Sequence, residues 1–332
     1  MLDTAVVGLG WWGRVIVPLV QSSAAFRVRS VVDPDRERAL PFASERGLNL
    51  APDLGSVLRD PAVQAVVLCT PHTLHCEQII AAAEAGKHVF CEKPLSLNRA
   101  DVLRAVAACE ANDVVLAVGH ERRFEPPVIE AMRRVRSGEL GRPLQVEANF
   151  SQDKFLGMAA DNWRMTEREA PAGPLTATGI HLLDLSVGVF GPAQQVFASV
   201  RQLGSDLRNG DTLAMLVTFK GGGHALISAI LATPFVGRFA VYCSRGWVEV
   251  RDRAHPESPQ GWTLTECVRG SDPVSRDYPA ASSVLANLEA FARAAQGIEP
   301  YPVSRAEMIA NISALEAVIR STGSGAAEAV EG

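Results

Sequence analysis

The chain has 332 residues, of which 47% are hydrophobic and 21% are charged, and its formal net charge is −5. This length suits two domains of ordinary size, and the composition is typical of a globular protein. Charges of both signs are scattered, so we expect no nucleic acid and no anionic membrane surface as partner. No apolar run reaches the length of a membrane span, and a strand-like run begins almost at once. We therefore expect a cytoplasmic protein without a signal peptide.

Strand-like and helical segments alternate over the first 120 residues. The expected strands are Thr4–Val7, Val28–Val32, Ala65–Cys69, His88–Cys91 and Val114–Val118. The expected helices between them are Trp12–Ser22, Asp35–Arg46, Leu74–Ala85 and Ala100–Ala111. The strand runs are apolar throughout, which is typical of parallel strands buried on both faces. The alternation predicts an α/β fold that opens with a Rossmann domain, a doubly wound parallel sheet, over residues 1–121.

The pattern changes at residue 122, where we place the start of a second α/β domain that runs to residue 332. The expected strands are Gln145–Phe150, Val196–Val200, Thr212–Phe219, His224–Ile230, Phe239–Cys243 and Trp247–Val250. The expected helices are Pro127–Arg136, Ile180–Phe190, Val284–Ala295 and Arg305–Thr322. This pattern predicts a large, mostly antiparallel open sheet, with C-terminal helices that pack back on the first domain. The last ten residues are expected to fray.

The first strand leads into the turn Gly8-Leu-Gly10-Trp-Trp-Gly13, and Asp33 follows the next strand. Gly8 permits the tight turn, Gly10 lets a pyrophosphate approach the backbone, and Gly13 lets the helix lie close to the strand. The start of that helix presents N–H groups to the phosphates, and Asp33 would accept hydrogen bonds from the ribose hydroxyls. The segment predicts a dinucleotide site that prefers NAD, because Asp33 would repel the extra phosphate of NADP. NADP stays the alternative, because two arginines follow Asp33 closely.

Two further segments, Thr70-Pro71 and Glu92-Lys93-Pro94, stand at strand ends, where ligands bind in doubly wound sheets. Pro94 biases Lys93 toward an extended backbone, and a lysine fixed near a nicotinamide could polarise a substrate oxygen or relay its proton. The alternative is a solvated lysine paired with Glu92.

The six cysteines include no C-x-x-C pair. We therefore expect buried thiols in a reducing compartment rather than disulfides, and we expect no metal site.

These segments and others further along the chain resemble the Gfo/Idh/MocA family, named after glucose–fructose oxidoreductase, inositol dehydrogenase and a rhizopine-catabolism protein. The matching motifs, which span essentially the whole chain, are Gly8-Leu-Gly10-Trp-Trp-Gly13, Thr70-Pro71-His72-x-x-His75, Ala85-Gly86-Lys87-His88-Val-x-Cys-Glu92-Lys93-Pro94, Gly119-His-x-Arg-Arg123-Phe124, Trp163-Arg164, Gly179-Ile-His181-Leu-Leu-Asp184 and Tyr301-Pro-Val-Ser304. The resemblance implies an NAD(P)-dependent oxidoreductase that transfers a hydride between nicotinamide and a carbinol or carbonyl carbon. Its substrate would be a sugar, a cyclic polyol or a related hydroxy compound. A homodimer or homotetramer built through the large sheet is also implied.

The resemblance assigns roles to individual residues. It makes Lys93 the catalytic lysine and His181 the acid/base, a role that suits a side chain able to exchange protons near neutral pH. The implied cofactor-binding residues are Gly8, Gly10, Trp11, Trp12, Gly13, Asp33, Thr70, Pro71, His75, Glu92, Lys93, Trp163 and Arg164. The implied substrate residues are Arg123, Thr178 and Asp184.

Several of these assignments have a structural alternative. Trp11 and Trp12 also suit packing in the core or at an interface, and His75 also suits helix capping or packing. Arg122 and Arg123 either line the substrate cleft or sit on a solvated element, which is the commoner place for basic residues.

One position departs from the family pattern. Members similar to inositol dehydrogenase carry an aspartate four residues before the histidine, and this chain has Ala177 there. The hydroxyl of Thr176 or Thr178 could replace its hydrogen bond but not its charge. Asp184 lies three residues after His181, on the same helical face, and is either a compensating carboxylate or a structural or substrate-contacting acid.

Two other functions stay open, the first because of this departure and the second because the fold also occurs in regulators. In the first, bound NAD is reduced and restored within one catalytic cycle, as in the glycosidases and lyases that work by transient redox chemistry. In the second, the chain is a nucleotide-sensing regulator and not an enzyme. Lys93 and His181 argue against the regulator, because it would need neither side chain.

Overall fold

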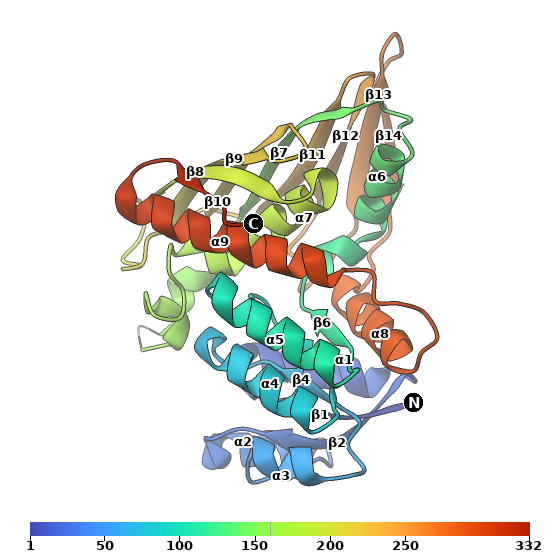
Figure 1. Ribbon diagram of the computed structural model, residues 1–332, viewed down its shortest axis with the longest axis vertical. Helices are drawn as coiled ribbons and strands as arrows, with labels where there is room; N and C mark the ends of the chain where they lie inside the picture. The colour runs from blue at the N-terminus through green and yellow to red at the C-terminus, as the bar shows by residue number, and fades with distance from the viewer. Residues whose placement is uncertain (160) are drawn as a thin grey trace. The chain divides into compact units, whose positions relative to one another are not determined.

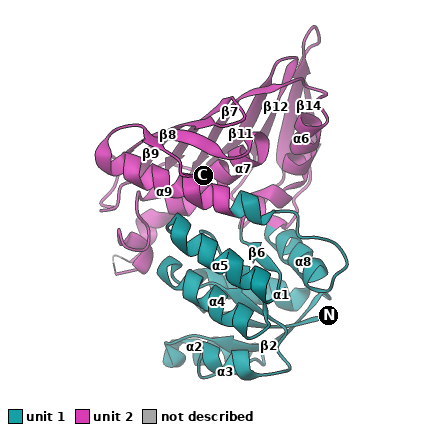
Figure 2. Cartoon of the chain, in the orientation of Figure 1, with its two compact units in different colours: residues 1–119, 284–308 teal, residues 120–283, 309–332 magenta. Residues whose placement is uncertain are grey.

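A computed structural model describes residues 1–159 and 161–332, which divide into two compact units (Figure 2). Unit 1 comprises residues 1–119 and 284–308, and unit 2 comprises residues 120–283 and 309–332. The first division falls two residues before the boundary predicted from the sequence. Unit 1 also takes in a segment close to the C-terminus, so the chain leaves this unit and returns to it.

Unit 1 is built on a six-stranded parallel sheet with the order β3-β2-β1-β4-β5-β6. Its strands are β1 (Leu2–Val7), β2 (Phe26–Val32), β3 (Asn49–Leu50), β4 (Ala65–Leu68), β5 (His88–Cys91) and β6 (Leu116–Val118). Its helices are α1 (Trp11–Ser22), α2 (Arg36–Glu45), α3 (Leu54–Arg59), α4 (His75–Glu84), α5 (Arg99–Ala111) and α8 (Ser283–Ala295). The doubly wound parallel sheet predicted from the alternating pattern is confirmed.

Helices cover both faces of this sheet, which explains why β4 and β6 are apolar and buried throughout. α1, α2 and α8 share one hydrophobic cluster with the strands, in which Ile16, Val67 and Phe291 are fully buried. α4 and α5 contact each other and lie side by side along the sheet (Figure 1). This arrangement leaves the carboxyl ends of the strands and the loops that follow them as the place for a ligand.

Unit 2 contains a nine-stranded sheet with the order β14-β13-β12-β11-β7-β10-β9-β8-β15. Its strands are β7 (Pro143–Ser151), β8 (Ala193–Arg201), β9 (Thr212–Phe219), β10 (His224–Ile230), β11 (Val236–Cys243), β12 (Gly246–Asp252), β13 (Trp262–Val268), β14 (Val274–Tyr278) and β15 (Glu328–Ala329). β7 and β10 pair in parallel, and the other neighbours pair antiparallel. The mostly antiparallel open sheet predicted from the sequence is confirmed.

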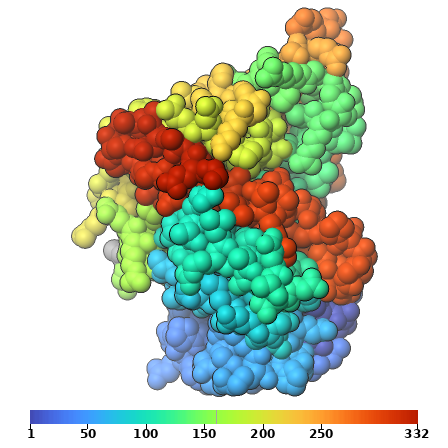
Figure 3. Space-filling model, in the orientation of Figure 1, coloured from blue at the N-terminus to red at the C-terminus, as the bar shows by residue number. Residues whose placement is uncertain are grey.

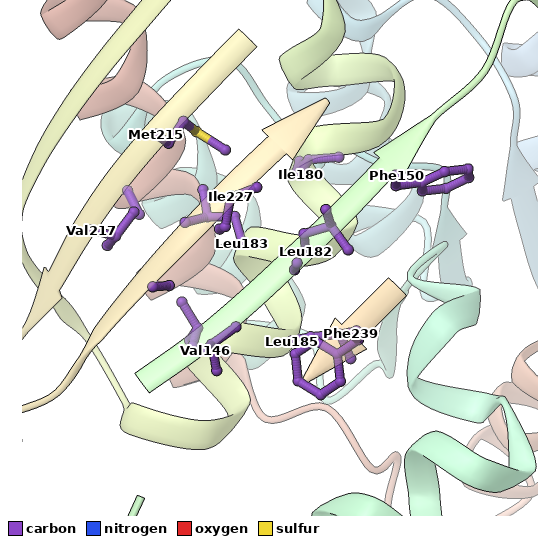
Figure 4. Packing of buried hydrophobic residues seen from close by; sticks show 14 of the residues in the cluster. Val146, Phe150, Ile180, Leu182, Leu183, Leu185, Met215, Val217, Ile227 and Phe239 are labelled. Atoms are coloured by element: carbon purple, nitrogen blue, oxygen red, sulfur yellow. The ribbon is translucent and has the colours of Figure 1, made fainter. Parts of the chain in front are cut away.

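The helices of unit 2 are α6 (Pro126–Arg136), α7 (Ile180–Phe190) and all of α9 (Arg305–Ser324) except its first turn. They share one hydrophobic core with the inward residues of the sheet. Figure 4 shows Leu182, Leu183 and Leu185 of α7 packed over the strands, close to Val146 and Phe239. α7 is buried almost all round, which fits its run of apolar residues. A π-helical turn (Leu175–Gly179) leads directly into it.

The expectation that the last ten residues fray is wrong. Glu328 and Ala329 form β15, which pairs antiparallel with β8, and the Val330 N–H donates to the Gln194 carbonyl at 2.9 Å. In the space-filling view the C-terminal residues, in red, lie against the yellow-green segment of the same unit (Figure 3). Strand pairing therefore outweighs the polar and glycine-rich composition of this segment.

Candidate active site

The three glycines of the first turn each occupy a position with a distinct steric requirement. Gly8 has φ = +92°, and a Cβ there would lie 2.7 Å from the Cys69 carbonyl oxygen. A Cβ at Gly13 would lie 1.8 Å from the Gly8 carbonyl oxygen, so only glycine lets α1 approach the strand this closely. A Cβ at Gly10 would meet nothing within 4 Å, and no side chain caps α1 there. This turn fits the pyrophosphate of a dinucleotide, because open space faces the start of a helix.

Asp33 is held beside this turn at the carboxyl end of β2. Its side chain is buried, and its two oxygens accept hydrogen bonds from the Leu9 N–H at 2.6 Å and the Asp35 N–H at 2.9 Å. Each carboxylate oxygen can accept a further hydrogen bond, so Asp33 can still bind ribose hydroxyls. The exposed Arg38 guanidinium reaches within 3.7 Å of the same carboxylate. The sequence prediction that an arginine near Asp33 could offset its charge therefore has a geometric basis.

His75, the first residue of α4, contacts the segments that follow β4 and β5. Its ring is fully buried, with Nδ1 at 2.7 Å from the Pro94 carbonyl oxygen and Nε2 at 3.0 Å from the Thr70 carbonyl oxygen. His75 thus links the Glu92-Lys93-Pro94 segment to the Thr70-Pro71 segment. These contacts agree with the alternative in which His75 has a packing role.

Glu92 lies deep in the same region. Its carboxylate accepts the Lys93 N–H at 3.3 Å and lies where a Cβ at Gly119 would approach within 2.6 Å. The Thr70 hydroxyl donates to the Gln78 side chain at 2.5 Å, and Pro71 precedes the 3₁₀ turn η1 (His72–Leu74). These contacts fix the backbone on both sides of the Lys93 side chain, which is itself half-buried.

The tryptophans of the glycine turn differ in exposure. Trp11 is 44% exposed, whereas Trp12 is partly buried and packs against the hydrophobic core of unit 1. Their ring centroids are 5.5 Å apart. The packing alternative therefore describes Trp12, and Trp11 lies at the surface at the start of α1.

In unit 2, His181 lies within the first turn of α7 and is buried. Its Nδ1 is 3.5 Å from Oε2 of Glu121, which belongs to the 3₁₀ turn η2 (Glu121–Phe124) and is also buried. The His181 ring packs edge-on against His120 at 5.5 Å and lies 6.0 Å from the Phe150 ring. His181 therefore has a carboxylate within ion-pair distance, although the sequence at Ala177 suggested that it had lost one.

Asp184, the acid that follows His181 on the same helix, is paired with an arginine. The guanidinium of Arg123 donates to both of its oxygens, Nε to Oδ2 at 2.6 Å and Nη2 to Oδ1 at 2.9 Å. Nε2 of His120 is 3.9 Å from the same carboxylate. The bidentate pair with Arg123 fits the alternative in which Asp184 is a structural acid.

The expectation that Arg122 and Arg123 sit on a solvated element is also wrong. Arg122 is 1% exposed, and its guanidinium is 2.5 Å from Oδ2 of Asp252 and 3.3 Å from Oε1 of Glu125. It also lies over the Phe150 ring at 5.0 Å. Arg122 is buried and Arg123 is largely buried, because Glu125 ahead of α6, Asp184 of α7 and Asp252 of β12 offer them carboxyl groups.

The charged groups of this cluster shift one another's pKa values. Burial alone would lower the pKa of Arg122, but Asp252 and Glu125 outweigh it, so that pKa lies above its ordinary value. Burial raises the pKa of Glu125 well above its usual range, and Arg122 opposes that shift only in part. The Arg122 guanidinium therefore lies among the carboxyl groups of Asp252, Glu125 and Glu121.

The remaining predicted residues lie elsewhere in unit 2. The Thr178 hydroxyl donates to the Pro174 carbonyl oxygen at 3.4 Å, within the π-helical turn. Ala177 packs against the small apolar cluster of Phe155, Leu207 and Leu231, which is not a setting for a carboxylate. In the 3₁₀ turn η4 (Trp163–Met165), the Arg164 guanidinium stacks over the Trp163 ring at 4.0 Å.

Sequence reasoning missed two residues of the histidine cluster, Glu121 and Phe150. Glu121 is the variable position of the motif Gly119-His-x-Arg-Arg123-Phe124, and a search for acids that follow the last Rossmann strand would have found it. Phe150 contacts His181, Arg122 and His255, and nothing in its strand pattern distinguished it from other core positions.

Two properties of the described part of the chain limit the chemistry. Within residues 1–159 and 161–332, no three His, Cys, Asp or Glu side chains gather in a geometry that could hold a metal ion. In the same residues, no helix combines the length and hydrophobicity that a bilayer crossing requires.

Comparison with known families assigns both halves of the chain. The family described as "Oxidoreductase family, NAD-binding Rossmann fold" matches residues 2–120, and the GFO/IDH/MocA C-terminal domain matches residues 128–249. The D-xylose 1-dehydrogenase (NADP(+)) 2 of Haloferax volcanii is 27% identical over 331 residues, 98% of each chain. The scyllo-inositol 2-dehydrogenase (NAD(+)) of Bacillus subtilis is 38% identical over 152 residues, 45% of this chain and 44% of that protein.

Solved structures share the whole fold. An aldose-aldose oxidoreductase from Caulobacter crescentus, complexed with glycerol, superposes with a TM-score of 0.86 at 25% identity and covers 99% of both chains. An oxidoreductase of Desulfitobacterium hafniense superposes with a TM-score of 0.90 over 99% of this chain, and at 21% identity it supports the fold alone. Given the two family matches and these relatives, the chain belongs to the Gfo/Idh/MocA oxidoreductase family and is an NAD(P)-dependent dehydrogenase.

Proposed function

We propose that the chain interconverts a secondary alcohol and its ketone, or a lactol and its lactone, on a sugar or cyclic polyol, with NAD as the preferred cofactor. The observation that carries the proposal is the glycine turn, where Gly8 and Gly13 exclude a side chain and Gly10 opens onto empty space. The residues of this turn would hold the pyrophosphate of the dinucleotide, whose nicotinamide would supply the hydride acceptor or donor. Relatives named for D-xylose and scyllo-inositol support this substrate class.

We assign the substrate's hydroxyl proton to Lys93 and His181. Lys93 suits the polarisation of a substrate oxygen, because contacts on both sides fix its backbone. His181 suits proton exchange, because an imidazole changes its charge near neutral pH. We assign Trp163 and Arg164, with the buried Arg123, Thr178 and Asp184, to the surroundings of substrate and nicotinamide.

The test is the absorbance of reduced nicotinamide during incubation with NAD or NADP and a panel of aldoses, inositols and other cyclic polyols. We expect net reduction with at least one compound, and a loss of about 10²–10⁴-fold in kcat/KM for Lys93→Met, with cofactor affinity retained. Lys220→Met removes an exposed lysine of unit 2 and is the matched control.

Two results would contradict the proposal. Binding of neither NAD nor NADP would remove its basis. Retained cofactor without net turnover on any compound would point instead to transient redox chemistry or to a nucleotide sensor. If Lys93→Met were as active as the wild type, dehydrogenation would stand and the role of Lys93 would fall.

The preference for NAD rests on Asp33, whose buried carboxylate would repel a 2′-phosphate. Arg38 works against the preference, because it is exposed and lies 3.7 Å from Asp33. The ratio of kcat/KM for NAD and NADP measures the balance, and a ratio below one would reverse the assignment.

We also propose a homodimer or homotetramer built through the nine-stranded sheet. Phe197, Leu216 and Leu226 are each at least 40% exposed. They are neighbours across β8, β9 and β10, because Phe197 pairs with Leu216 and Leu216 with Leu226. A row of apolar side chains on an open sheet face is suited to burial against a second copy. Light scattering coupled to size-exclusion chromatography gives the oligomeric state, and a monomer would overturn this proposal.

A cytoplasmic setting fits the cysteines. Burial raises the pKa of the Cys91 thiol well above its usual value and raises those of Cys76 and Cys109 to about 11. These thiols stay protonated and unreactive at neutral pH, as in proteins of a reducing compartment.

A further inference from the structure

We propose that Glu121 is the carboxylate that orients His181 and stabilises its protonated form. Glu121 is thus a positioning residue for the acid/base step. The inference rests on the proposed function of His181 and adds a residue to it. Its basis is the 3.5 Å approach of Glu121 Oε2 to His181 Nδ1 between two buried side chains.

The nearby alternatives are occupied or absent. Asp184, on the same helix as His181, is held through both oxygens by Arg123. One turn before His181 the helix carries Ala177, whose side chain packs into an apolar cluster. Carboxylate support for His181 therefore comes from a different segment of the chain, the η2 turn.

The surrounding charges keep a negative charge next to His181. The groups that face the pair from neighbouring elements are Arg122 and Arg123 of η2, His120 before it, Glu125 before α6, Asp184 of α7, Asp252 of β12, and His255 across Phe150. Arg123 and Asp184 cancel each other, and so do Arg122 and Asp252, which are 2.5 Å apart. The negative charge of Glu121 is then in excess next to His181, where it favours the imidazolium.

An approach of 3.5 Å is an ion-pair distance rather than a hydrogen bond. In the proposed role the Glu121 carboxylate favours the ring proton on Nδ1, the nitrogen that it faces, and leaves Nε2 as the base. When an alcohol is oxidised, the substrate O–H bond breaks and its proton forms an N–H bond at Nε2. The hydride leaves the carbon with the C–H electron pair for the nicotinamide. The positive charge that His181 gains then faces Glu121, so the carboxylate lowers the cost of proton transfer.

The direct test is an NMR titration of the His181 imidazole, which needs no substrate. The signal is assigned among the seven histidines by its loss in His181→Asn. Glu121→Gln keeps the shape of the side chain and removes its charge, and we expect the titration midpoint of His181 to move about one pH unit lower. Glu125→Gln removes a buried carboxyl group that pairs with Arg122 at 3.3 Å, so we expect this control to move the midpoint less than about half as far. An unchanged midpoint in Glu121→Gln would overturn the inference.

Kinetics on the substrate found above give an independent readout. We expect the acidic limb of the kcat/KM profile of Glu121→Gln to move to lower pH by the same interval as the NMR midpoint. In the His181→Asn background, Glu121→Gln should change kcat/KM less than about twofold, because it acts through His181. Fully additive losses in the double variant would instead assign Glu121 a structural role and overturn the inference.

A second variant, Glu121→Asp, keeps the inference testable if Glu121→Gln does not fold. Glu121→Asp keeps the charge and shortens the reach, so the midpoint should stay within about half a unit of the wild-type value while kcat/KM falls. A shift as large as that expected for Glu121→Gln would contradict a role for the charge. The two proposals fail separately: absence of turnover removes the dehydrogenase but leaves the NMR result standing, whereas an unmoved midpoint removes Glu121 alone.

Discussion

The glycine turn of unit 1 and the histidine cluster of unit 2 are specified by the sequence in different ways. The residues of the turn follow one another closely, from Gly8 to Gly13, and Asp33 joins them one strand later. The cluster gathers side chains from η2, β7, α7 and β12, which are separated by as many as 130 residues. The turn requires positions where the backbone comes so close that a side chain does not fit. The cluster requires buried charges of opposite sign that balance one another.

This difference decides how each region fails. A turn built on close backbone contact tolerates no added atom at Gly8 or Gly13, although these glycines can be recognised from the sequence. A buried charge cluster tolerates changes of shape but not the loss of one partner, because the remaining charge has no solvent to stabilise it.

The largest effect is expected within the turn, from Gly13→Ala. The new Cβ would lie 1.8 Å from the Gly8 carbonyl oxygen, and backbone would have to move. We expect a loss of about 3–5 kcal/mol in the free energy of unfolding, at the upper end for single substitutions, together with the loss of NAD binding. Urea unfolding and calorimetric titration with NAD measure the two quantities.

Gly10→Ala is the matched control within the same turn. Nothing lies within 4 Å of its Cβ, so the fold should keep its stability within about 1 kcal/mol while the methyl group obstructs the pyrophosphate. If Gly13→Ala were also stable and lost only NAD affinity, the close contact between α1 and the strand would not be what requires glycine there.

The next effect is expected from Arg122→Met in the cluster. The substitution removes the guanidinium from the buried Asp252 carboxylate, which still accepts a hydrogen bond from the Trp262 indole N–H at 3.1 Å. Removal of one partner of a buried ion pair costs about 3–5 kcal/mol, and we expect a value near the lower end because methionine refills the apolar contact with Phe150.

The control for Arg122 is Arg251→Met in β12. Arg251 is 61% exposed and pairs with Glu249 at 2.6 Å. A surface pair of this kind contributes at most about 1 kcal/mol. Equal losses in the two variants would contradict the view that burial, rather than the number of ion pairs, makes the cluster sensitive.

The contrast between a local turn and a cluster assembled from distant segments also explains which features could be predicted from the sequence. The Rossmann order, the open sheet and the roles expected of Gly8, Gly10 and Gly13 follow from local pattern, because spacing alone fixes which backbone positions meet. The carboxylate next to His181 could not be derived that way. Asp184 is nearer in sequence and on the correct helical face, but Arg123, whose burial the sequence did not indicate, binds it first. The pairing of the C-terminal strand with β8 was missed for a similar reason, because strand partners are chosen in three dimensions.

The smallest effect is expected from Glu130→Gln on α6, whose charges lie close to the cluster in sequence but on the surface. Its carboxylate accepts hydrogen bonds from Arg133 and Arg134, which lower the pKa of Glu130 to about 2. A carboxyl whose pKa is lowered on folding stabilises the fold above its usual pKa and loses that contribution as the pH falls toward 2. Because solvent screens this site, we expect Glu130→Gln to cost about 0.5–1 kcal/mol at pH 7 and almost nothing near pH 2.

Urea unfolding at several pH values measures the loss of unfolding free energy in Glu130→Gln, with Glu37→Gln as the control. Glu37 is an exposed glutamate in the first turn of α2, and it forms no ion pair within the described part of the chain. We expect the cost of Glu37→Gln to stay below about 0.5 kcal/mol at every pH. A loss in Glu130→Gln as large as that of Arg122→Met would mean that charge density alone governs stability in unit 2. A loss confined to pH values above 4 and below about 1 kcal/mol would place the sensitivity of this unit in its buried charges, where Glu121 and His181 lie.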